Sequence, residues 1–124
     1  MTMHYELSQR FFFEAAHTLH RDHEADASRR IHGHTYRAKV TIAGSRDART
    51  GMVVDLALLR DAVEQAKAQL DHRLLDEVEQ LGAATLENLC AFIHRQVSRP
   101  GWRVARVEVA REASGDSCCL TADD

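Results

Sequence analysis

Apolar and polar positions alternate in two segments of the first third of the chain, and this alternation predicts two β-strands. Residues 3–17 are rich in aromatic side chains, and residues 32–44 alternate more regularly, with His34 in phase with the apolar face. Residues 18–31 between them are polar and mix acidic with basic side chains, so we expect a long loop, and loops of this length inside compact domains are usually functional. The apolar face of the second strand consists of Tyr36, Ala38, Val40 and Ile42.

Helical periodicity follows in the middle of the chain, where apolar residues recur every three or four positions. Asp55 and Thr85 each precede such a stretch and are typical helix N-caps, because their side-chain oxygens can accept a bond from the first turn. The first helix is predicted to run to about Leu70, and Pro100-Gly101 ends the second. The apolar stripes are Leu56, Leu59, Val63, Ala66 and Leu70 in the first helix, and Leu86, Leu89, Phe92, Ile93 and Val97 in the second.

Alternation returns in residues 102–112, with a phase slip, and a last strand is predicted over residues 117–121. The resulting order is ββααββ, with no internal repeat and no linker. Paired strands flanking two helices favour an α+β domain with an antiparallel sheet and the helices on one face. We therefore expect residues 1–124 to form a single domain.

Composition narrows the functional classes. The chain has 124 residues, of which 44% are hydrophobic and 28% charged, and its formal net charge is -3. A negative balance without a basic run argues against general nucleic-acid binding. No apolar stretch is long enough to cross a membrane and no signal peptide is visible, so we expect a cytoplasmic protein. The odd cysteine count predicts buried or idle thiols, not disulfides, at Cys90, Cys118 and Cys119.

Three histidines are the candidate metal ligands. His32 and His34 lie two apart on a predicted strand and so face the same side, and His17 lies near the end of the neighbouring predicted strand. Three neutral imidazoles can hold a zinc ion and leave its fourth position open, although imidazole also suits copper, iron and nickel. The alternative is that His17 packs in the core and that the other two are chance neighbours.

The pair Asp71-His72 is the candidate proton shuttle, because an aspartate can orient an adjacent imidazole and raise its basicity. From these residues alone, a polar turn between the two helices is the better explanation of the pair.

Five segments together resemble one family, the 6-pyruvoyltetrahydropterin synthases, which includes 6-carboxytetrahydropterin synthase of the queuosine and deazapurine pathway. The resemblance covers nearly the whole chain and depends on the order and spacing of the five segments. These are Phe13-Glu14-Ala15-Ala16-His17, His32-Gly33-His34, Asp71-His72-Arg73-Leu74, Thr85-Leu86-Glu87-Asn88-Leu89 and Val109-Ala110-Arg111-Glu112.

The resemblance implies a fold and an assembly. The expected fold is the tunnelling fold, a four-stranded antiparallel sheet with two helices between its hairpins. Subunits would join their sheets into a barrel-like trimer, and two trimers would stack into a hexamer with active sites at subunit interfaces. The implied activity is that of a zinc-dependent carbon-oxygen lyase acting on 7,8-dihydroneopterin triphosphate or a related pterin.

The resemblance also implies roles for individual residues. His17, His32 and His34 would bind Zn²⁺, and Asp71 with His72 would transfer protons. Three further residues would bind the pterin: Glu112 would anchor its amino-pyrimidine edge through paired hydrogen bonds, and Thr85 and Glu87 would line its pocket.

The chain departs from the family at one catalytic position. Where the family has a cysteine, four residues before His32, this chain has Ser28, and where a related branch has a glutamate it has Arg29. A serine hydroxyl is a much poorer base than a thiolate. Glu24 or Asp26 would then be the candidates to assist His72, and Arg29 with Arg30 would hold a triphosphate.

Two alternatives to an enzyme follow from this departure. The first is a non-catalytic pterin-binding carrier or regulatory protein, which would bind pterins without turnover. The second is a structural metal-binding module, which would unfold when its metal is removed.

Overall fold

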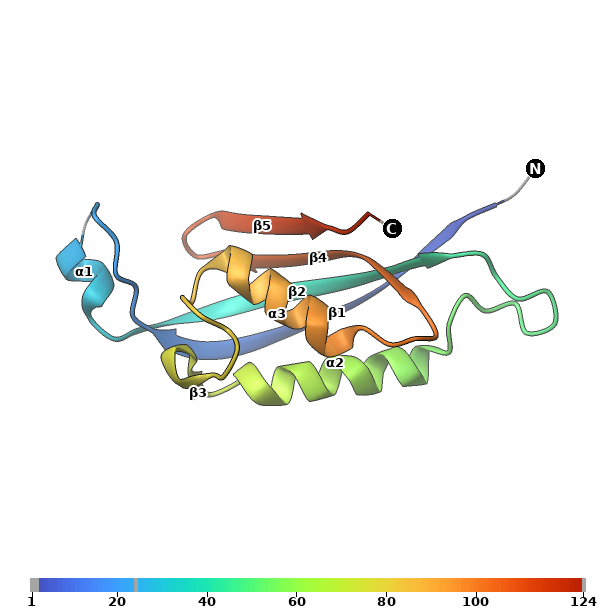
Figure 1. Cartoon of the computed structure of the whole chain (residues 1–124), viewed down its shortest axis with the longest axis horizontal. Coiled ribbons are helices and arrows are strands. Elements are labelled where there is room, and N and C mark those ends of the chain that lie inside the picture. Colours follow the sequence, from blue (N-terminus) through green and yellow to red (C-terminus); the bar gives the residue numbers. More distant parts are fainter. Residues whose placement is uncertain (1–2, 24, 124) are drawn as a thin grey trace.

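The computed structural model describes residues 3–23 and 25–123 and shows a twisted sheet with helices on one face (Figure 1). Strands β1 (Tyr5–His17) and β2 (His32–Gly44) pair antiparallel along their whole length. Strand β4 (Arg103–Arg111) pairs with β2, and β5 (Asp116–Thr121) pairs with β4, both antiparallel. These four strands confirm the antiparallel core predicted from the sequence.

The predicted strand count of four is wrong, because the sheet has five strands in the order β3-β1-β2-β4-β5. The additional strand, β3 (Arg73–Leu74), has two residues and runs parallel to β1 at Ala15 and Ala16. Two residues within a charged segment are too few to show any alternation, so hydrophobic periodicity could not reveal this strand.

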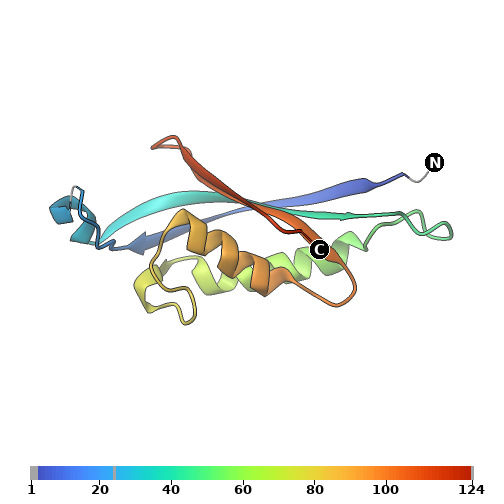
Figure 2. The same cartoon turned by 45° about the horizontal axis from the view of Figure 1, so that its top comes forward.

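Helices α2 (Leu56–Leu70) and α3 (Leu86–Val97) lie together on one face of the sheet, as the turned view shows (Figure 2). Both predicted N-caps are confirmed. The Asp55 carboxylate accepts a hydrogen bond from the Ala57 amide at 2.9 Å, and the Thr85 hydroxyl oxygen accepts one from the Asn88 amide at 3.1 Å. None of the helices within the described ranges is long and apolar enough to span a membrane.

A third, short helix, α1 (Ala25–Arg29), lies in the segment that was expected to be a loop throughout. It extends beyond the β1/β2 end of the sheet (Figure 1). Five residues are little more than one helical turn, too short for a periodic pattern and too short to be stable without tertiary support. A single 3₁₀ turn, η1 (Leu75–Glu77), follows β3.

The hydrophobic core lies between the sheet and α2 and α3. On β1 the inward residues Phe11, Phe13, Ala15 and His17 are all buried, which continues the alternation to the last residue of the strand. The phase slip predicted within residues 102–112 is a β-bulge: Arg106 pairs with Thr41 but Val104 pairs with Ile42, so Ala105 is the extra residue.

Candidate metal centre

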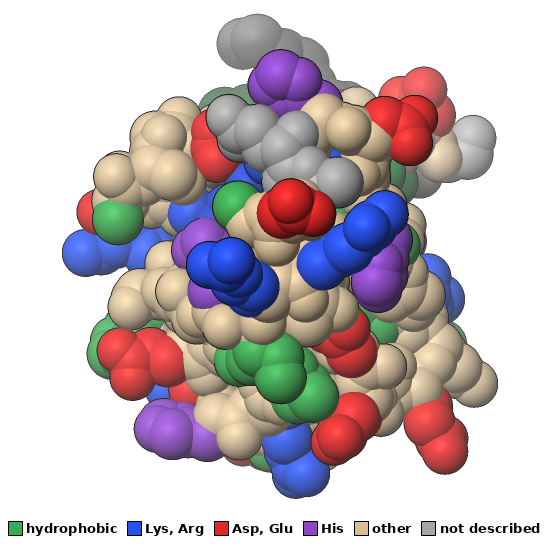
Figure 3. All heavy atoms as spheres, turned by 90° about the vertical axis from the view of Figure 1, so that its left-hand side faces the viewer, with side chains coloured by type: hydrophobic (Ala, Val, Ile, Leu, Met, Phe, Trp, Pro, Cys, Tyr) green, Lys and Arg blue, Asp and Glu red, His purple; other side chains and the backbone are tan. Residues whose placement is uncertain are grey.

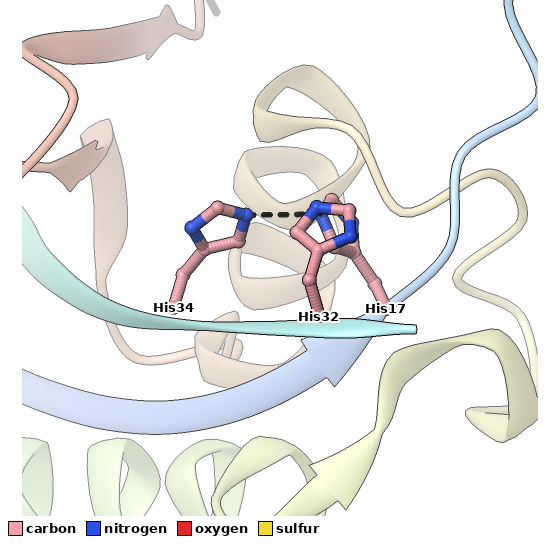
Figure 4. Close-up of side chains that lie close together, drawn as sticks. All are labelled: His17, His32 and His34. Carbon is pink, nitrogen blue, oxygen red and sulfur yellow. Dashed lines mark hydrogen bonds between the residues drawn. The ribbon is translucent and has the colours of Figure 1, made fainter. Parts of the chain in front are cut away.

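The three predicted histidine ligands come together at one end of the β1/β2 pair. His17 is the last residue of β1 and pairs directly with His32, the first residue of β2. His34 lies two residues further along β2 and therefore on the same face. Figure 4 shows the three imidazoles rising from the same side of the two strands. We call these three residues the histidine cluster.

The Nε2 atoms of the histidine cluster converge on one point. The Nε2 atom of His17 lies 3.0 Å from that of His32 and 3.2 Å from that of His34. One nitrogen from each ring can be chosen so that all three lie within 4.8 Å of one another. Three nitrogens this close can bind a single metal ion, and the geometry brings together the ligand set that the sequence predicted.

Two of the three rings are fixed in the orientation that a metal requires. His17 Nδ1 lies 2.9 Å from the Ala84 carbonyl oxygen, and His32 Nδ1 lies 2.7 Å from the Arg30 carbonyl oxygen. Because a carbonyl oxygen can only accept, each Nδ1 carries the hydrogen and each Nε2 keeps its lone pair. Such outer hydrogen bonds orient histidine ligands in metal sites.

Burial favours the neutral imidazole at two of the three positions. It lowers the pKa of His34 to about 4, with the nearby Arg111 guanidinium acting in the same direction, and it also lowers the pKa of His17. Neutral imidazole is the form that binds metals. The donor set therefore fits a zinc ion with an open coordination position, and by ligand type it also suits copper, iron or nickel.

An aspartate far away in the sequence fixes the backbone next to the cluster. The Asp76 carboxylate accepts hydrogen bonds from the Thr18 amide, at 2.8 Å, and from the Thr18 hydroxyl. Thr18 directly follows His17, so this contact fixes the direction in which the chain leaves β1. Sequence reasoning missed Asp76, because only the folded chain brings η1 beside the end of β1.

The histidine cluster opens into a cavity of about 200 Å³ that is also lined by Ser28, Arg21, Arg111 and Asp116. Ser28 is buried, and its hydroxyl oxygen accepts a hydrogen bond from Arg21 Nε at 2.6 Å. Ser28 thus lies beside the cluster, as its position in the motif implies. At this end of the molecule, basic side chains and histidines lie close together on the surface (Figure 3).

Sequence reasoning also missed Arg21 and Arg111. Arg111 was predictable, because it continues the inward alternation of Val107 and Val109 to the end of β4. Arg21 lies outside regular secondary structure and gave no such signal.

The Asp71–His72 pair forms but lies apart from the histidine cluster. His72 Nδ1 is 3.1 Å from Asp71 Oδ1, which also accepts a hydrogen bond from the Glu14 amide at 3.0 Å. That amide is the main reason why the pKa of Asp71 is below its usual value. The His72 side chain is 78% exposed and lines a separate depression of about 530 Å³ together with Glu14 and Thr35.

The residues matched to pterin binding are also outside the cluster's cavity. Glu112 forms an exposed ion pair with Arg37, at 2.9 Å, and by strand alternation Arg37 lies on the opposite face of the sheet from His34. Thr85 caps α3, and Glu87 is exposed in its first turn.

The residues suggested to assist catalysis or hold a triphosphate do not join the cluster either. Asp26, Arg29 and Arg30 are exposed and are not among the described residues that line the cavity. Glu24 lies outside the described residues.

Comparisons with known proteins identify the family. Residues 6–122 match the family model of 6-pyruvoyl tetrahydropterin synthase. The chain is 35% identical to the 6-carboxy-5,6,7,8-tetrahydropterin synthase of Synechocystis over 73% of each chain. It is 34% identical to human 6-pyruvoyl tetrahydrobiopterin synthase, over 71% of this chain and 70% of the human one.

The fold is also that of a solved structure from the same group. The 6-pyruvoyl tetrahydropterin synthase of Caenorhabditis elegans superposes with a TM-score of 0.81 over 98% of both chains, at 24% identity. A match over almost the whole sequence, together with this shared fold, leaves one conclusion. The chain belongs to the 6-pyruvoyl tetrahydropterin synthase family.

Proposed function

We propose that this protein is a zinc-dependent carbon-oxygen lyase of the 6-pyruvoyl/6-carboxytetrahydropterin synthase type, acting in the cytoplasm on 7,8-dihydroneopterin triphosphate or a related pterin. Residues 1–124 would form one domain of this type, and queuosine biosynthesis is one pathway that uses such an enzyme. The observation that carries the proposal is the convergence of the Nε2 atoms of His17, His32 and His34 in a chain of this family.

In this proposal the histidine cluster holds Zn²⁺, which when bound supplies Lewis acidity toward the hydroxyl groups of the substrate side chain. Asp71 and His72 move the protons. Asp71 Oδ1 lies beside His72 Nδ1, so a hydrogen on Nδ1 leaves Nε2 able to accept a proton from the substrate. The bond from the Glu14 amide keeps the Asp71 carboxylate in place for this role.

Glu112 would bind the amino-pyrimidine edge of the pterin, because a carboxylate can accept two parallel N–H donors. In the isolated chain this carboxylate pairs with Arg37 in an exposed position, so the pterin edge would replace or share that contact. Thr85 and Glu87 would line the pterin pocket from the start of α3.

The separation of these groups supports a homo-oligomer with active sites at subunit interfaces. One chain places the histidine cluster, the Asp71–His72 pair and Glu112 in three different locations. Its β5 also lies at an edge of the sheet, where unpaired backbone groups favour pairing with another chain. We propose a hexamer, a dimer of trimers, in which neighbouring subunits complete each site.

A second candidate function is a non-catalytic pterin-binding carrier or regulatory protein. The observation that favours it is the bond from Arg21 to Ser28 at the position of the family's cysteine. A hydroxyl that accepts a bond from a guanidinium is a poor base, since the positive charge draws electron density from the oxygen. Such a protein would bind pterins and release them unchanged.

Product analysis distinguishes the two functions. The zinc-loaded protein is incubated with 7,8-dihydroneopterin triphosphate and the products are identified by mass spectrometry. We expect turnover by the native protein and its loss in His72→Ala, while His4→Ala, which changes an exposed histidine outside the candidate site, stays active.

A Ser28→Cys variant is tested in parallel. Turnover by Ser28→Cys alone, with tight pterin binding by the native chain, would support the carrier. If neither protein binds or converts a pterin, both functions are wrong.

A further inference from the structure

Among the described residues that line it, the cavity beside the histidine cluster carries two positive charges and one negative charge. Two guanidinium groups, from Arg21 and Arg111, line it together with one carboxylate, Asp116. The imidazoles bind a metal in their neutral form and add no charge. Any divalent cation on the cluster would increase the positive charge further. A small space with this balance attracts anions.

Arg111 has hydrogen-bonding capacity that the described part of the chain does not use. Its Nη2 atom donates to Asp116 Oδ2 at 3.0 Å, and the Ser114 hydroxyl donates to the same carboxylate oxygen. The Arg111 Nε atom is buried and has no hydrogen-bond partner among the described residues. A buried donor without an acceptor costs free energy, so an acceptor supplied by a ligand would be favoured there.

A second buried polar atom occurs next to the cluster. The hydroxyl of Tyr36, which is completely buried, also lacks a hydrogen-bond partner within the described ranges. Its ring packs edge-on against His34, with the ring centroids 5.6 Å apart. The Arg111 guanidinium lies close enough to this hydroxyl to act against the larger effect of burial, which raises the pKa of Tyr36, so the two polar groups that lack a well-formed hydrogen bond lie near each other and one acceptor atom would serve both.

Ser28 and Arg21, which also line the cavity, supply further donors. Arg21 Nε donates to the Ser28 oxygen, which leaves the hydroxyl hydrogen of Ser28 available to another acceptor. The Ser28 carbonyl accepts a bond from the Leu19 amide at 2.7 Å, and this fixes the backbone that carries the hydroxyl.

The size of the cavity limits what can enter. Its volume of about 200 Å³ is below the roughly 300–1,000 Å³ of pockets that enclose a whole small molecule. It therefore suits one substituent of a ligand, with the remainder outside.

We propose that this cavity binds the oxyanion of the substrate, a phosphoryl or carboxylate group, between Arg111 and Arg21 and beside the metal position. This assigns the anion to Arg21 and Arg111, and not to Arg29 and Arg30, which are not among the described residues that line the cavity. The inference rests on the proposed function for the identity of the substrate, but anion binding itself is measurable without any turnover.

The test is calorimetric titration of the zinc-loaded protein with inorganic phosphate, and in parallel with acetate, at constant ionic strength. We expect Arg111→Met to weaken the binding of the preferred anion by about tenfold or more, because a charge-assisted bond is lost. Zinc content, measured on the same samples, should not change. Arg49→Met removes the same charge from an exposed turn outside the cavity and should alter the affinity by less than about twofold, since salt screens distant charges.

The two anions distinguish the possible sources of the oxyanion. Binding of phosphate alone through Arg111 indicates a phosphoryl group, and binding of acetate alone indicates a carboxylate. If the native protein binds neither anion, or if Arg111→Met binds as tightly as the native protein, the inference is wrong.

Two further results keep this test separate from the proposed function. If Arg111→Met does not fold or loses zinc, Arg111→Lys replaces it. This variant keeps the charge but not the planar guanidinium, and the inference requires it to bind the anion more weakly than the native protein.

Anion binding without pterin turnover would contradict only the proposed enzyme, and turnover without anion binding would contradict only this inference.

Discussion

His17 Nδ1 donates a hydrogen bond to the carbonyl oxygen of Ala84, at 2.9 Å and across 67 residues of sequence. The bond connects the end of β1 to the segment that leads into α3, and it turns the other ring nitrogen toward His32 and His34. The candidate metal centre is therefore tied to the packed part of the fold, and the described residues of the hydrophobic core include none of the three histidines.

Removal of the metal should leave the fold intact. Most of the core lies between the sheet and the two long helices, whereas the cluster lies at one end of the β1/β2 pair. We expect a chelator to lower the melting temperature but to preserve the far-ultraviolet circular dichroism spectrum, since a bound ion adds a stabilisation that grows only with the logarithm of its concentration relative to its dissociation constant. Unfolding on chelation would instead identify the protein as a structural metal-binding module.

Hybrid oligomers should test the interface site directly. His34→Ala should lose the metal and His72→Ala should lose the proton shuttle, so each variant should be inactive alone. If different subunits supply the two groups to one site, unfolding the two variants together and refolding them should restore part of the turnover. No turnover would be recovered if one subunit supplied both groups to a site. The matched control is His34→Ala unfolded and refolded alone under the same conditions.

The contact between Asp76 and Thr18 should make stability depend on pH. Burial acts to raise the pKa of Asp76, but the hydrogen bonds from the Thr18 hydroxyl and amide outweigh it, so the pKa in the folded state is below the ordinary value. A carboxyl group of this kind stabilises the fold above its unfolded pKa, and this stabilisation is lost as the pH falls through the folded pKa.

We therefore expect Asp76→Ala to cost about 0.5–1.5 kcal/mol in the free energy of unfolding near neutral pH, because solvent screens an exposed carboxylate. The difference from the native protein should shrink as the pH falls below about 4. Urea denaturation at several pH values measures it, with Asp123→Ala, which changes an exposed aspartate, as the control. A difference that stayed constant down to the lowest pH would show that the carboxylate charge is not involved.

The cysteines should differ in reactivity. Burial raises the pKa of the Cys90 thiol to about 12, with the neighbouring Cys118 acting in the same direction. Because only the thiolate reacts with alkylating agents, Cys90 should be labelled only after denaturation. Cys119 is exposed and should react first. Peptide mass mapping after iodoacetamide treatment at pH 8 measures the order, with Cys119→Ser as the control, and labelling of native Cys90 as fast as Cys119 would contradict it.

The sequence predicted those parts of the structure in which a local pattern of apolar and polar residues is compatible with only one kind of secondary structure. Alternation at β1 and β2 determined which residues face the core, and the side chains of Asp55 and Thr85 determined where the helices begin. The same alternation predicted that His32 and His34 project together. These features depend on neighbours within a few residues, which is why the sequence is sufficient for them.

Short elements escaped this reasoning. Strand β3 and helix α1 have two and five residues, too few for a period to appear, and both depend on contacts with the rest of the fold. The bulge at Ala105 was visible only as a phase slip. How the bulge shifts the register between β4 and β2 could be seen only from the pairing of the two strands in the folded chain.

The sequence by itself determined the antiparallel strand pairs, the two long helices and the identity of the three histidines. Only the tertiary structure decided how the histidine rings are oriented, that Arg21 and Arg111 share their cavity, and that Asp71–His72 and Glu112 lie elsewhere in the same chain. The reason is that strand and helix periodicity fix the direction of a side chain within its own element. Contacts between segments far apart in sequence arise only when the elements pack.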